Sequence, residues 1–451
     1  MPRNNKQSHM TMAQESAPFW CAEAKPTRTL YCVDLFAGCG GLSLGLELAG
    51  FRPLLFSEIN SSAAETYLAN RTGQNIAYIG DIEKLTDVKL RNFMSMWSVQ
   101  GIKDIDLVTG GPPCQGYSGI GHRRTFKLDK RDIPSNHLYL EMIRVIRGAK
   151  PKLFLFENVK GLLHARWGPE GKPGEAFQDV LKAFRQIPDY EVRWELVHAK
   201  DYGVPQNRPR VLIAGIRQDI ASSLKQTLSS TLIETGAIEA GFLPKPSGTP
   251  PTLEELLSDL VDINYEEKTE TTEYPHSTLS PVQEWFRRKA DGGISQKGEA
   301  LTEHKYSAHS EHIRRKFRWM IDKGGDIPLE FRTKKFAQRV LPKRWSSKEG
   351  PNITATSLPD DYVHFDQARI PTVREWARLQ TFPDRYLFKG PRTTGGRRRA
   401  GDPSADIWGR DVPRYTQIGN AVPVILARAI GEHFAALLES VKTLHETVHS
   451  K

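Results

Sequence analysis

The first half of the chain alternates short apolar runs with stretches whose apolar residues recur every three to four positions. Apolar runs of this length indicate buried strands, and the wider spacing indicates helices that bury one face. The pattern predicts strands at 29–38, 54–60, 75–85, 104–111, 151–159, 190–198 and 210–216. It predicts helices at 41–50, 61–70, 136–149, 175–187 and about 421–443. This alternation predicts an α/β fold with a doubly wound, mostly parallel sheet, in which ligands bind at the carboxyl ends of the strands.

The pattern changes near residue 218, where the apolar spacing becomes irregular. Beyond this point acidic stretches alternate with basic aromatic ones, notably 312–320 and 332–345. We therefore expect a second, smaller domain. The predicted parts of the chain are a disordered leader (1–27), a first domain (28–217), the second domain (218–371) and a segment that returns to the first domain (372–451).

The composition is that of a globular protein, with 39% hydrophobic and 26% charged residues. We find no apolar run near the ~18 residues that a membrane span needs. The N-terminus lacks the apolar core of a secretory signal, so we expect a cytoplasmic protein. The net charge of +10 favours a polyanionic partner without proving one.

The chain has four cysteines, Cys21, Cys32, Cys39 and Cys114. No CxxC pair is present and no histidine stands at zinc-site spacing, so we expect no metal and a reduced, cytosolic protein. Cys32 and Cys39 are best explained as core residues. Cys114 follows two prolines in GGPPCQGYS, and these fix the backbone before it. Such a backbone suits a reactive thiol, but it also suits an ordinary strand-to-loop turn.

A glycine loop, DLFAGCGG, follows the first predicted strand and precedes a predicted helix. Glycines let a backbone approach a ligand, and a helix N-terminus lies just beyond them. Glu58 ends the second strand and Asp81 the third, where acids bind ribose and base groups. Each acid alone is more simply explained as a helix cap. The glycine loop, Glu58 and Asp81 all stand at the ends of predicted strands, however, and together they favour a ligand site. The loop lacks a Walker lysine and a basic group for pyrophosphate, so a nucleoside without phosphates, such as S-adenosylmethionine, fits better than NAD.

Eight motifs, which stand in the family's order, resemble those of the cytosine-5 DNA methyltransferases. They are DLFAGCGGLSLGLELAGF (34–51), the acid Glu58, GDI (80–82), GGPPCQGYS (110–118), ENV (157–159), QNRPR (206–210), REWARLQTFPD (374–384) and QIGNAVP (417–423). Their blocks span 34–217 and 372–430, and the combination of PPCQ, ENV and RLQTFPD is highly specific. The resemblance implies the Rossmann-like fold of S-adenosylmethionine-dependent methyltransferases, with residues 218–371 as a target-recognition domain whose sequence reader lies at about 300–360.

The resemblance also implies four catalytic residues. Cys114 would add as a thiolate to carbon 6 of a flipped-out cytosine, so that carbon 5 attacks the methyl sulfonium of S-adenosylmethionine. Glu157 would hold ring N3. Arg208 would contact the cytosine carbonyl, with Arg210 as its neighbour. Taken alone, Glu157 fits a helix cap and the two arginines fit a solvated strand face. The glycine-rich basic segment 115–135 resembles a mobile loop that closes on DNA.

The implied cofactor site has nine residues: Phe36, Gly38, Gly40, Glu58, Ile59, Asp81, Ile82, Pro112 and Asn420. Phe36 would stack on the adenine, while Gly38 and Gly40 would approach the methionine part. Glu58 would bind the ribose and Asp81 the adenine amino group, and Asn420 would lie near the methionine. Position 59 is often a large aromatic residue in the family, so Ile59 leaves the second face of the adenine open to question.

These motifs are compatible with three functions. They are a site-specific DNA methyltransferase, an RNA (tRNA) cytosine-5 methyltransferase, and a catalytically inactive DNA-binding regulator. The complete catalytic set argues against the regulator, and the long basic segment 218–371 favours double-stranded DNA over tRNA. The short N-terminus resembles stand-alone prokaryotic restriction–modification enzymes, which implies a monomer on DNA and a cognate restriction endonuclease. Residues 389–412 resemble an insertion whose Arg397, Arg398 and Arg399 suit phosphates.

Overall fold

The computed structural model describes residues 29–113, 131, 133–224, 235–332, 338–344, 350–355, 358–394 and 412–449. Four predicted features lie wholly or mostly outside these residues: the leader 1–27, Cys114, the loop 115–135, and the arginines Arg397–Arg399.

The described part of the chain contains a seven-stranded sheet in the order β3-β2-β1-β4-β5-β7-β6. Its strands are β1 (Leu30–Leu35), β2 (Phe51–Ser57), β3 (Ala77–Ile79), β4 (Leu107–Gly110), β5 (Leu153–Val159), β6 (Tyr190–His198) and β7 (Pro209–Arg217). Strands β1 to β5 pair in parallel, whereas β7 runs antiparallel between β5 and β6. The predicted doubly wound, mostly parallel α/β sheet is confirmed.

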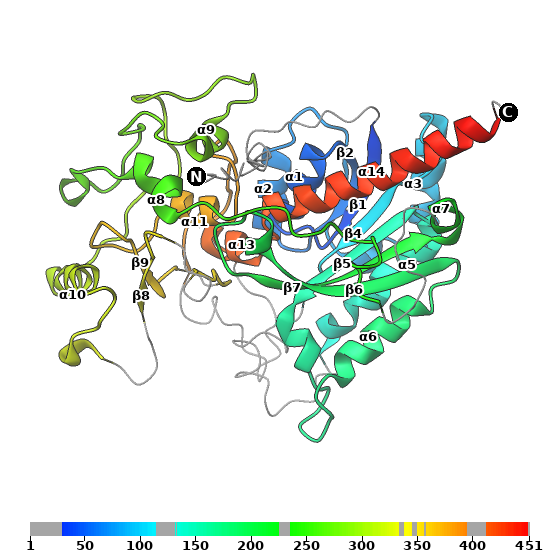
Figure 1. Cartoon of the computed structure of the whole chain (residues 1–451), viewed down its shortest axis with the longest axis horizontal. Coiled ribbons are helices and arrows are strands. Elements are labelled where there is room, and N and C mark those ends of the chain that lie inside the picture. Colours follow the sequence, from blue (N-terminus) through cyan, green and yellow to red (C-terminus); the bar gives the residue numbers. More distant parts are fainter. Residues whose placement is uncertain are drawn as a thin grey trace, which may run out of the picture.

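Helices cover both faces of this sheet (Figure 1). They are α1 (Gly41–Leu48), α2 (Ser61–Ala69), α3 (Asp87–Val99), α5 (Leu138–Ala149), α6 (Glu175–Arg185), α7 (Gln218–Ser223) and α14 (Val424–His449). One apolar core lies between the sheet and helices α1 and α14 and extends into residues 253–388, and a second lies between the sheet and helices α3, α5 and α6. Alternate residues of β1 serve the two cores, since Cys32 belongs to the first and Val33 to the second.

The close packing of α1 on α14 depends on two glycines. A Cβ on Gly41 would lie 2.5 Å from the carbonyl oxygen of Val422, and one on Gly45 would collide with Ala427. Cys32 and Cys39 are free and buried, as predicted for core residues. Among the described residues, one helical stretch, Arg414–Val441, has the length and apolar composition of a membrane-crossing helix. In its most apolar window 72% of the residues are buried, as in a core helix.

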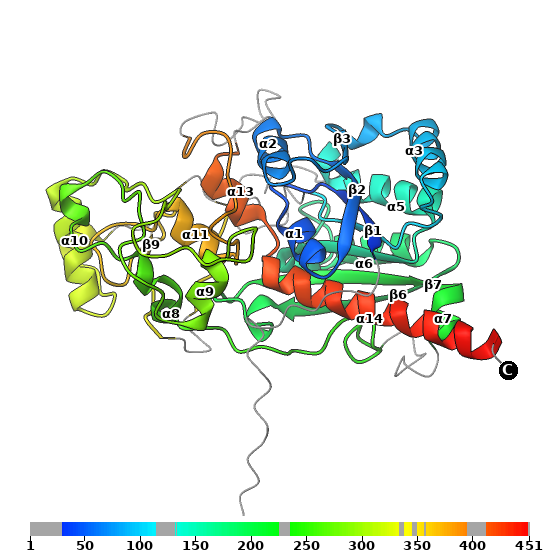
Figure 2. The ribbon, with the colours of Figure 1, turned by 90° about the horizontal axis from the view of Figure 1, so that it is seen from above.

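A second, smaller lobe lies beside the sheet (Figure 2). It contains α8 (Leu253–Leu257), α9 (Pro281–Arg287), α10 (Glu311–Asp322) and the short parallel strands β8 (Arg339–Val340) and β9 (Tyr362–Val363). Helices α11 (Val373–Leu379) and α13 (Arg414–Asn420) lie between this lobe and the sheet (Figure 2).

Buried ion pairs join α11 to the smaller lobe. The guanidinium of Arg378 contacts Asp259 at 2.6 Å and Asp384 at 2.6 Å, and Arg287 contacts Asp259 at 2.7 Å. All four side chains are almost fully buried, so these charges are stable only as a paired set. The RLQTFPD motif therefore fixes the smaller lobe in place.

Candidate active site

Glu157 and Arg210 form an ion pair where the carboxyl end of β5 meets the start of β7. In the antiparallel register Glu157 lies opposite Leu212, so Arg210 is its diagonal neighbour on the same face. The Nε atom of Arg210 lies 2.5 Å from Oε1 of Glu157, and both side chains are about nine-tenths buried. The contact is an ion pair rather than an aligned hydrogen bond, because Arg210 Nε has no hydrogen-bond partner.

The glycine-proline segment before Cys114 is held against this pair. A Cβ on Gly111 would lie 2.7 Å from Oε2 of Glu157, so only glycine fits there without displacing the carboxylate. The amide of Asn158 donates to the carbonyl of Pro112 at 3.2 Å. Cys114, which follows Pro113 in the sequence, lies outside the described residues. The roles of Gly111 and Asn158 were missed from the sequence, although both belong to motifs that were recognised.

The Arg208 side chain binds main-chain carbonyls rather than Glu157. Its Nη1 donates to the carbonyl of Ile353 at 2.6 Å and its Nη2 to the carbonyl of Gly419 at 2.5 Å. The side chain is buried, and burial together with the nearby Arg210 guanidinium lowers its pKa. The sequence assigns contact with the base to Arg208, but the structure places Arg210, not Arg208, against Glu157.

The glycine loop after β1 has a backbone that L-residues rarely adopt. Phe36 has φ = 57°, and its N–H donates to the hydroxyl of Ser57 at 3.1 Å. Such strain in a non-glycine residue persists mainly where function requires it. Gly38 has φ = 56°, and a Cβ there would meet no atom within 4 Å. The loop therefore presents an open backbone beside the first turn of α1, whose N-cap, Gly40, supplies no side-chain hydrogen bond.

Glu58 braces this loop from the end of β2. Its carboxylate accepts the N–H of Gly38 at 2.9 Å and the N–H of Asn60 at 2.8 Å. Burial raises the pKa of Glu58, and the two backbone hydrogen bonds oppose that rise. Asp81 accepts the N–H of Glu83 at 3.1 Å and so caps a short 3-10 helix. Each acid thus has a structural role, and both still lie at the carboxyl edge of the sheet.

Of the remaining predicted cofactor residues, two are exposed and two are buried. Ile59 is 76% exposed, and Asn420 is exposed at the end of α13. Ile82 is 4% exposed and belongs to the second core, and Pro112 is buried beneath Asn158. The QIGNAVP segment that carries Asn420 packs on the start of α1, as the contact of Gly41 with Val422 shows.

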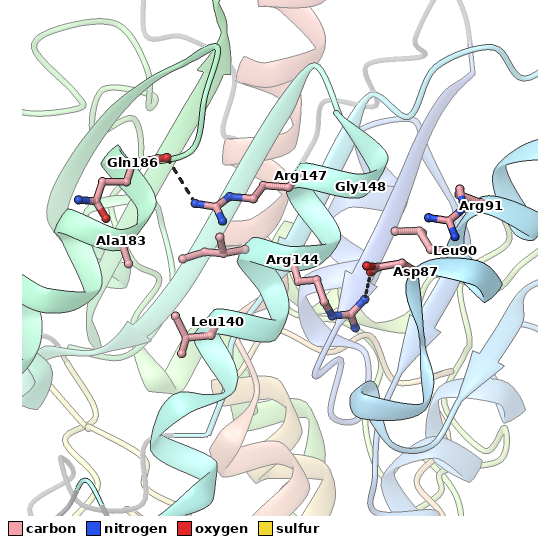
Figure 3. Close-up of a pocket in the computed structure, with 10 residues that line it drawn as sticks. Asp87, Leu90, Arg91, Leu140, Arg144, Arg147, Gly148, Ala183 and Gln186 are labelled. Carbon is pink, nitrogen blue, oxygen red and sulfur yellow. Dashed lines mark hydrogen bonds and ion pairs between the residues drawn. The ribbon is translucent and has the colours of Figure 1, made fainter.

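A cavity among the described residues lies away from this edge. It has a volume of about 600 Å³ and is lined by α3, α5 and the end of α6 (Figure 3). Three arginines line it, and one of them, Arg144, is paired with Asp87 at 2.7 Å. Neither Glu157 nor Glu58 lines the cavity, so the cavity does not mark the candidate site.

Helix α10 carries the basic aromatic residues expected to read DNA. Phe317 and Met320 are buried in a small core of the second lobe. Arg318 is already paired, at 3.0 Å with Glu266 and at 2.7 Å with Glu311. Helix α10 therefore buries one apolar stripe, as an ordinary surface helix does. Arg315 and Trp319 remain exposed on its surface.

Comparisons with known proteins agree with this geometry. The profile of the C-5 cytosine-specific DNA methylase family matches residues 30–436. The chain is 30% identical to the type II methyltransferase M.DdeI of Desulfomicrobium norvegicum, with 92% of this chain and 91% of that protein covered. It is 31% identical to the type II methyltransferase M.PspPI of a Psychrobacter species, with 95% and 86% covered.

A solved structure described as a prophage-encoded DNA modification methyltransferase of E. coli has the same fold. Its TM-score is 0.61 at 24% identity, and the match covers 91% of this chain and 100% of that one. The family profile spans nearly the whole described chain, from β1 to α14. The chain therefore belongs to the C-5 cytosine-specific DNA methylase family and is a DNA (cytosine-5)-methyltransferase.

Proposed function

We propose that this chain methylates cytosine at a specific site in double-stranded DNA, as the modification enzyme of a type II restriction–modification system. Its relatives M.DdeI and M.PspPI are type II methyltransferases. The exposed basic residues and the net charge of +10 suit a DNA partner. We place the enzyme in the cytoplasm, where its DNA substrate lies, and expect it to act as a monomer with a cognate endonuclease in the same system.

The observation that carries this proposal is the buried pair of Glu157 and Arg210 directly beneath Gly111. Carbon 5 of cytosine is a poor nucleophile until a thiolate adds to carbon 6. We assign that addition to Cys114, three residues beyond Gly111. As the thiolate adds, ring N3 takes up a proton from solvent and donates it in a hydrogen bond to the Glu157 carboxylate, while Arg210 donates to the cytosine carbonyl, so charge that develops on the ring is neutralised. Once carbon 5 is methylated, water takes the proton from carbon 5. The bond from carbon 6 to sulfur then breaks and N3 returns its proton to solvent, which restores the thiolate and leaves 5-methylcytosine.

The glycine loop fits S-adenosylmethionine, the methyl donor of this family. When bound, this cofactor supplies an electrophilic methyl group. Glu58 would accept hydrogen bonds from the ribose hydroxyls. Each carboxylate oxygen has two lone pairs, and the N–H groups of Gly38 and Asn60 use only one on each. The uncapped first turn of α1 would bind the carboxylate of the methionine part. Phe36 and Asp81 would contact the adenine.

Residues 218–371 are proposed to read the target sequence, with the exposed Arg315 and Trp319 of α10 as candidates for contacts with DNA. The domain boundaries themselves stay a prediction. Helix α7, placed in the second domain by the sequence, packs on the first, since Ile220, Ala221 and Leu224 belong to the core between the sheet and α14.

Paired substitutions of the two arginines test the proposal. Arg210→Met should lower kcat by at least ~100-fold, in the range found for lost electrostatic stabilisers, while DNA binding changes little. It should also lower the unfolding temperature, because it leaves the buried Glu157 carboxylate without its cation, so kcat is measured well below the unfolding transition. Arg208→Met should also lower the unfolding temperature, because it leaves the carbonyls of Ile353 and Gly419 without their donors, but the protein that remains folded should keep its kcat. Normal turnover in Arg210→Met, with loss of turnover at unchanged stability in Arg208→Met, would return the catalytic role to Arg208.

A further inference from the structure

An aromatic side chain beside Glu58 has no part in the mechanism above. Strand β3 pairs with β2 so that Tyr78 lies opposite Phe56, two residues before Glu58. The Tyr78 side chain is 43% exposed, and its hydroxyl donates to the main-chain carbonyl of Glu58 at 3.1 Å. Its ring stacks on Phe56, with centroids 4.9 Å apart and planes 20° apart. Tyr78 is thus held on one side by a ring and on the other by the backbone of Glu58.

The support beneath Tyr78 continues into the protein. Phe56 stacks on Tyr67 with centroids 3.9 Å apart, and both rings are fully buried. The guanidinium of Arg71 lies 3.8 Å from the centroid of the Tyr67 ring. Arg71 also donates to the carbonyl of Gly40 at 3.3 Å. A rigid column therefore runs from the exposed ring of Tyr78 to the glycine loop.

The orientation of Glu58 depends on its backbone as well as its carboxylate. Both carboxylate oxygens accept backbone N–H groups, from Gly38 and Asn60, so the side chain and the loop are held together. The hydroxyl of Tyr78 fixes the carbonyl of the same residue. Partial burial and the nearby Glu58 carboxylate raise the pKa of Tyr78, which keeps its hydroxyl protonated and able to donate.

We propose that Tyr78 is a positioning residue for cofactor binding, which acts by fixing the backbone of Glu58 so that its carboxylate meets the ribose hydroxyls. This inference rests on the proposed S-adenosylmethionine site at Glu58. Tyr78 does not touch the reacting atoms. It sets the affinity for the cofactor and leaves the chemical step unchanged.

A double-mutant cycle tests this role, with Tyr78→Phe and Glu58→Ala made singly and together. Tyr78→Phe keeps the stacked ring and removes only the hydroxyl. It should weaken S-adenosylmethionine binding by about 3- to 10-fold in calorimetry, which corresponds to one neutral hydrogen bond. The KM for S-adenosylmethionine should rise by the same factor, with kcat unchanged at saturating cofactor. Tyr202→Phe, which loses a similar bond to the carbonyl of Pro244 at 2.8 Å, is the matched control and should leave the cofactor affinity unchanged.

The cycle distinguishes a positioning role from a merely structural one. If Tyr78 acts through Glu58, Tyr78→Phe should change the affinity by less than about 2-fold once Glu58 is alanine, because contacting residues are coupled. The same fold-change in both backgrounds, or unchanged affinity in Tyr78→Phe alone, overturns the inference while the proposed function stands. Unchanged affinity in Glu58→Ala would instead show that the ribose binds elsewhere, which overturns the proposed cofactor site and this inference with it.

Discussion

Gly111→Ala should slow methyl transfer without unfolding the protein. A Cβ at this position would lie 2.7 Å from Oε2 of Glu157, whereas ordinary contacts begin at 3.4 Å. The difference, 3.4 minus 2.7, requires the carboxylate to retreat by about 0.7 Å. Since Arg210 already lies 2.5 Å from the other oxygen, such a retreat disturbs the pair that we propose holds the base. A misplacement of ~1 Å can cost ~100-fold in rate, so we expect kcat to fall by roughly 10- to 100-fold.

The assay is transfer of labelled methyl groups to DNA at saturating cofactor, with calorimetry of S-adenosylmethionine binding and thermal unfolding measured alongside. Gly111 does not need a positive φ, so alanine should leave the unfolding temperature nearly unchanged. Gly293→Ala is the control, because its Cβ would meet only flexible side chains, those of Asp291 at 3.2 Å and Lys289 at 3.8 Å. Full kcat in Gly111→Ala would refute the reasoning, since it would mean that the position of the Glu157 carboxylate does not matter to the reaction.

Two further predictions concern stability and recognition. Burial raises the pKa of Asp34 to about 7, so the folded protein loses stability as the pH rises from about 4 to 7, and Asp34→Asn removes this dependence. The stability of Asp34→Asn relative to wild type should therefore rise by roughly 2–3 kcal/mol between pH 5 and pH 8 in urea unfolding, and a fall would contradict the assignment. Replacing residues 218–371 by the matching segment of a relative with another target should transfer that target in a methylation-protection assay. An active chimera that keeps its original site would place recognition elsewhere, with Arg397–Arg399 as the next candidates.

The sequence predicts the order of the seven strands of the sheet because each buried strand of this fold is a short apolar run. It misses helix α3, of which only Leu90 and Trp97 are buried. It also identifies Glu157, Glu58 and the glycine loop, because their motifs stand at the ends of predicted strands. It does not separate Arg208 from Arg210. That choice depends on the antiparallel register of β5 and β7, which sets Arg210 diagonal to Glu157. Periodicity along one strand carries no information about its partner's register.

Residues whose partners are main-chain carbonyls also could not be identified from the sequence. Tyr78 belongs to β3, a strand of only three residues, and its partner is a main-chain carbonyl. Asn158 likewise binds a carbonyl, that of Pro112, from a neighbouring strand. On α10 the basic residues suggest a DNA surface, yet Arg318 is already paired with Glu266 and Glu311. The pair of Arg318 with Glu266 joins residues 52 positions apart in the sequence, so it becomes visible only in the folded chain.

The most direct test of the central claim is covalent capture by Cys114. Duplex DNA with 5-fluorocytosine at the target position should form a stable adduct with the wild-type protein in the presence of S-adenosylmethionine, because fluorine blocks the final proton loss. Mass spectrometry should locate the DNA on the peptide that contains Cys114. Cys114→Ser should form no adduct and transfer no methyl group, while it still binds DNA and cofactor. Turnover by Cys114→Ser, or an adduct at another residue, would contradict the account.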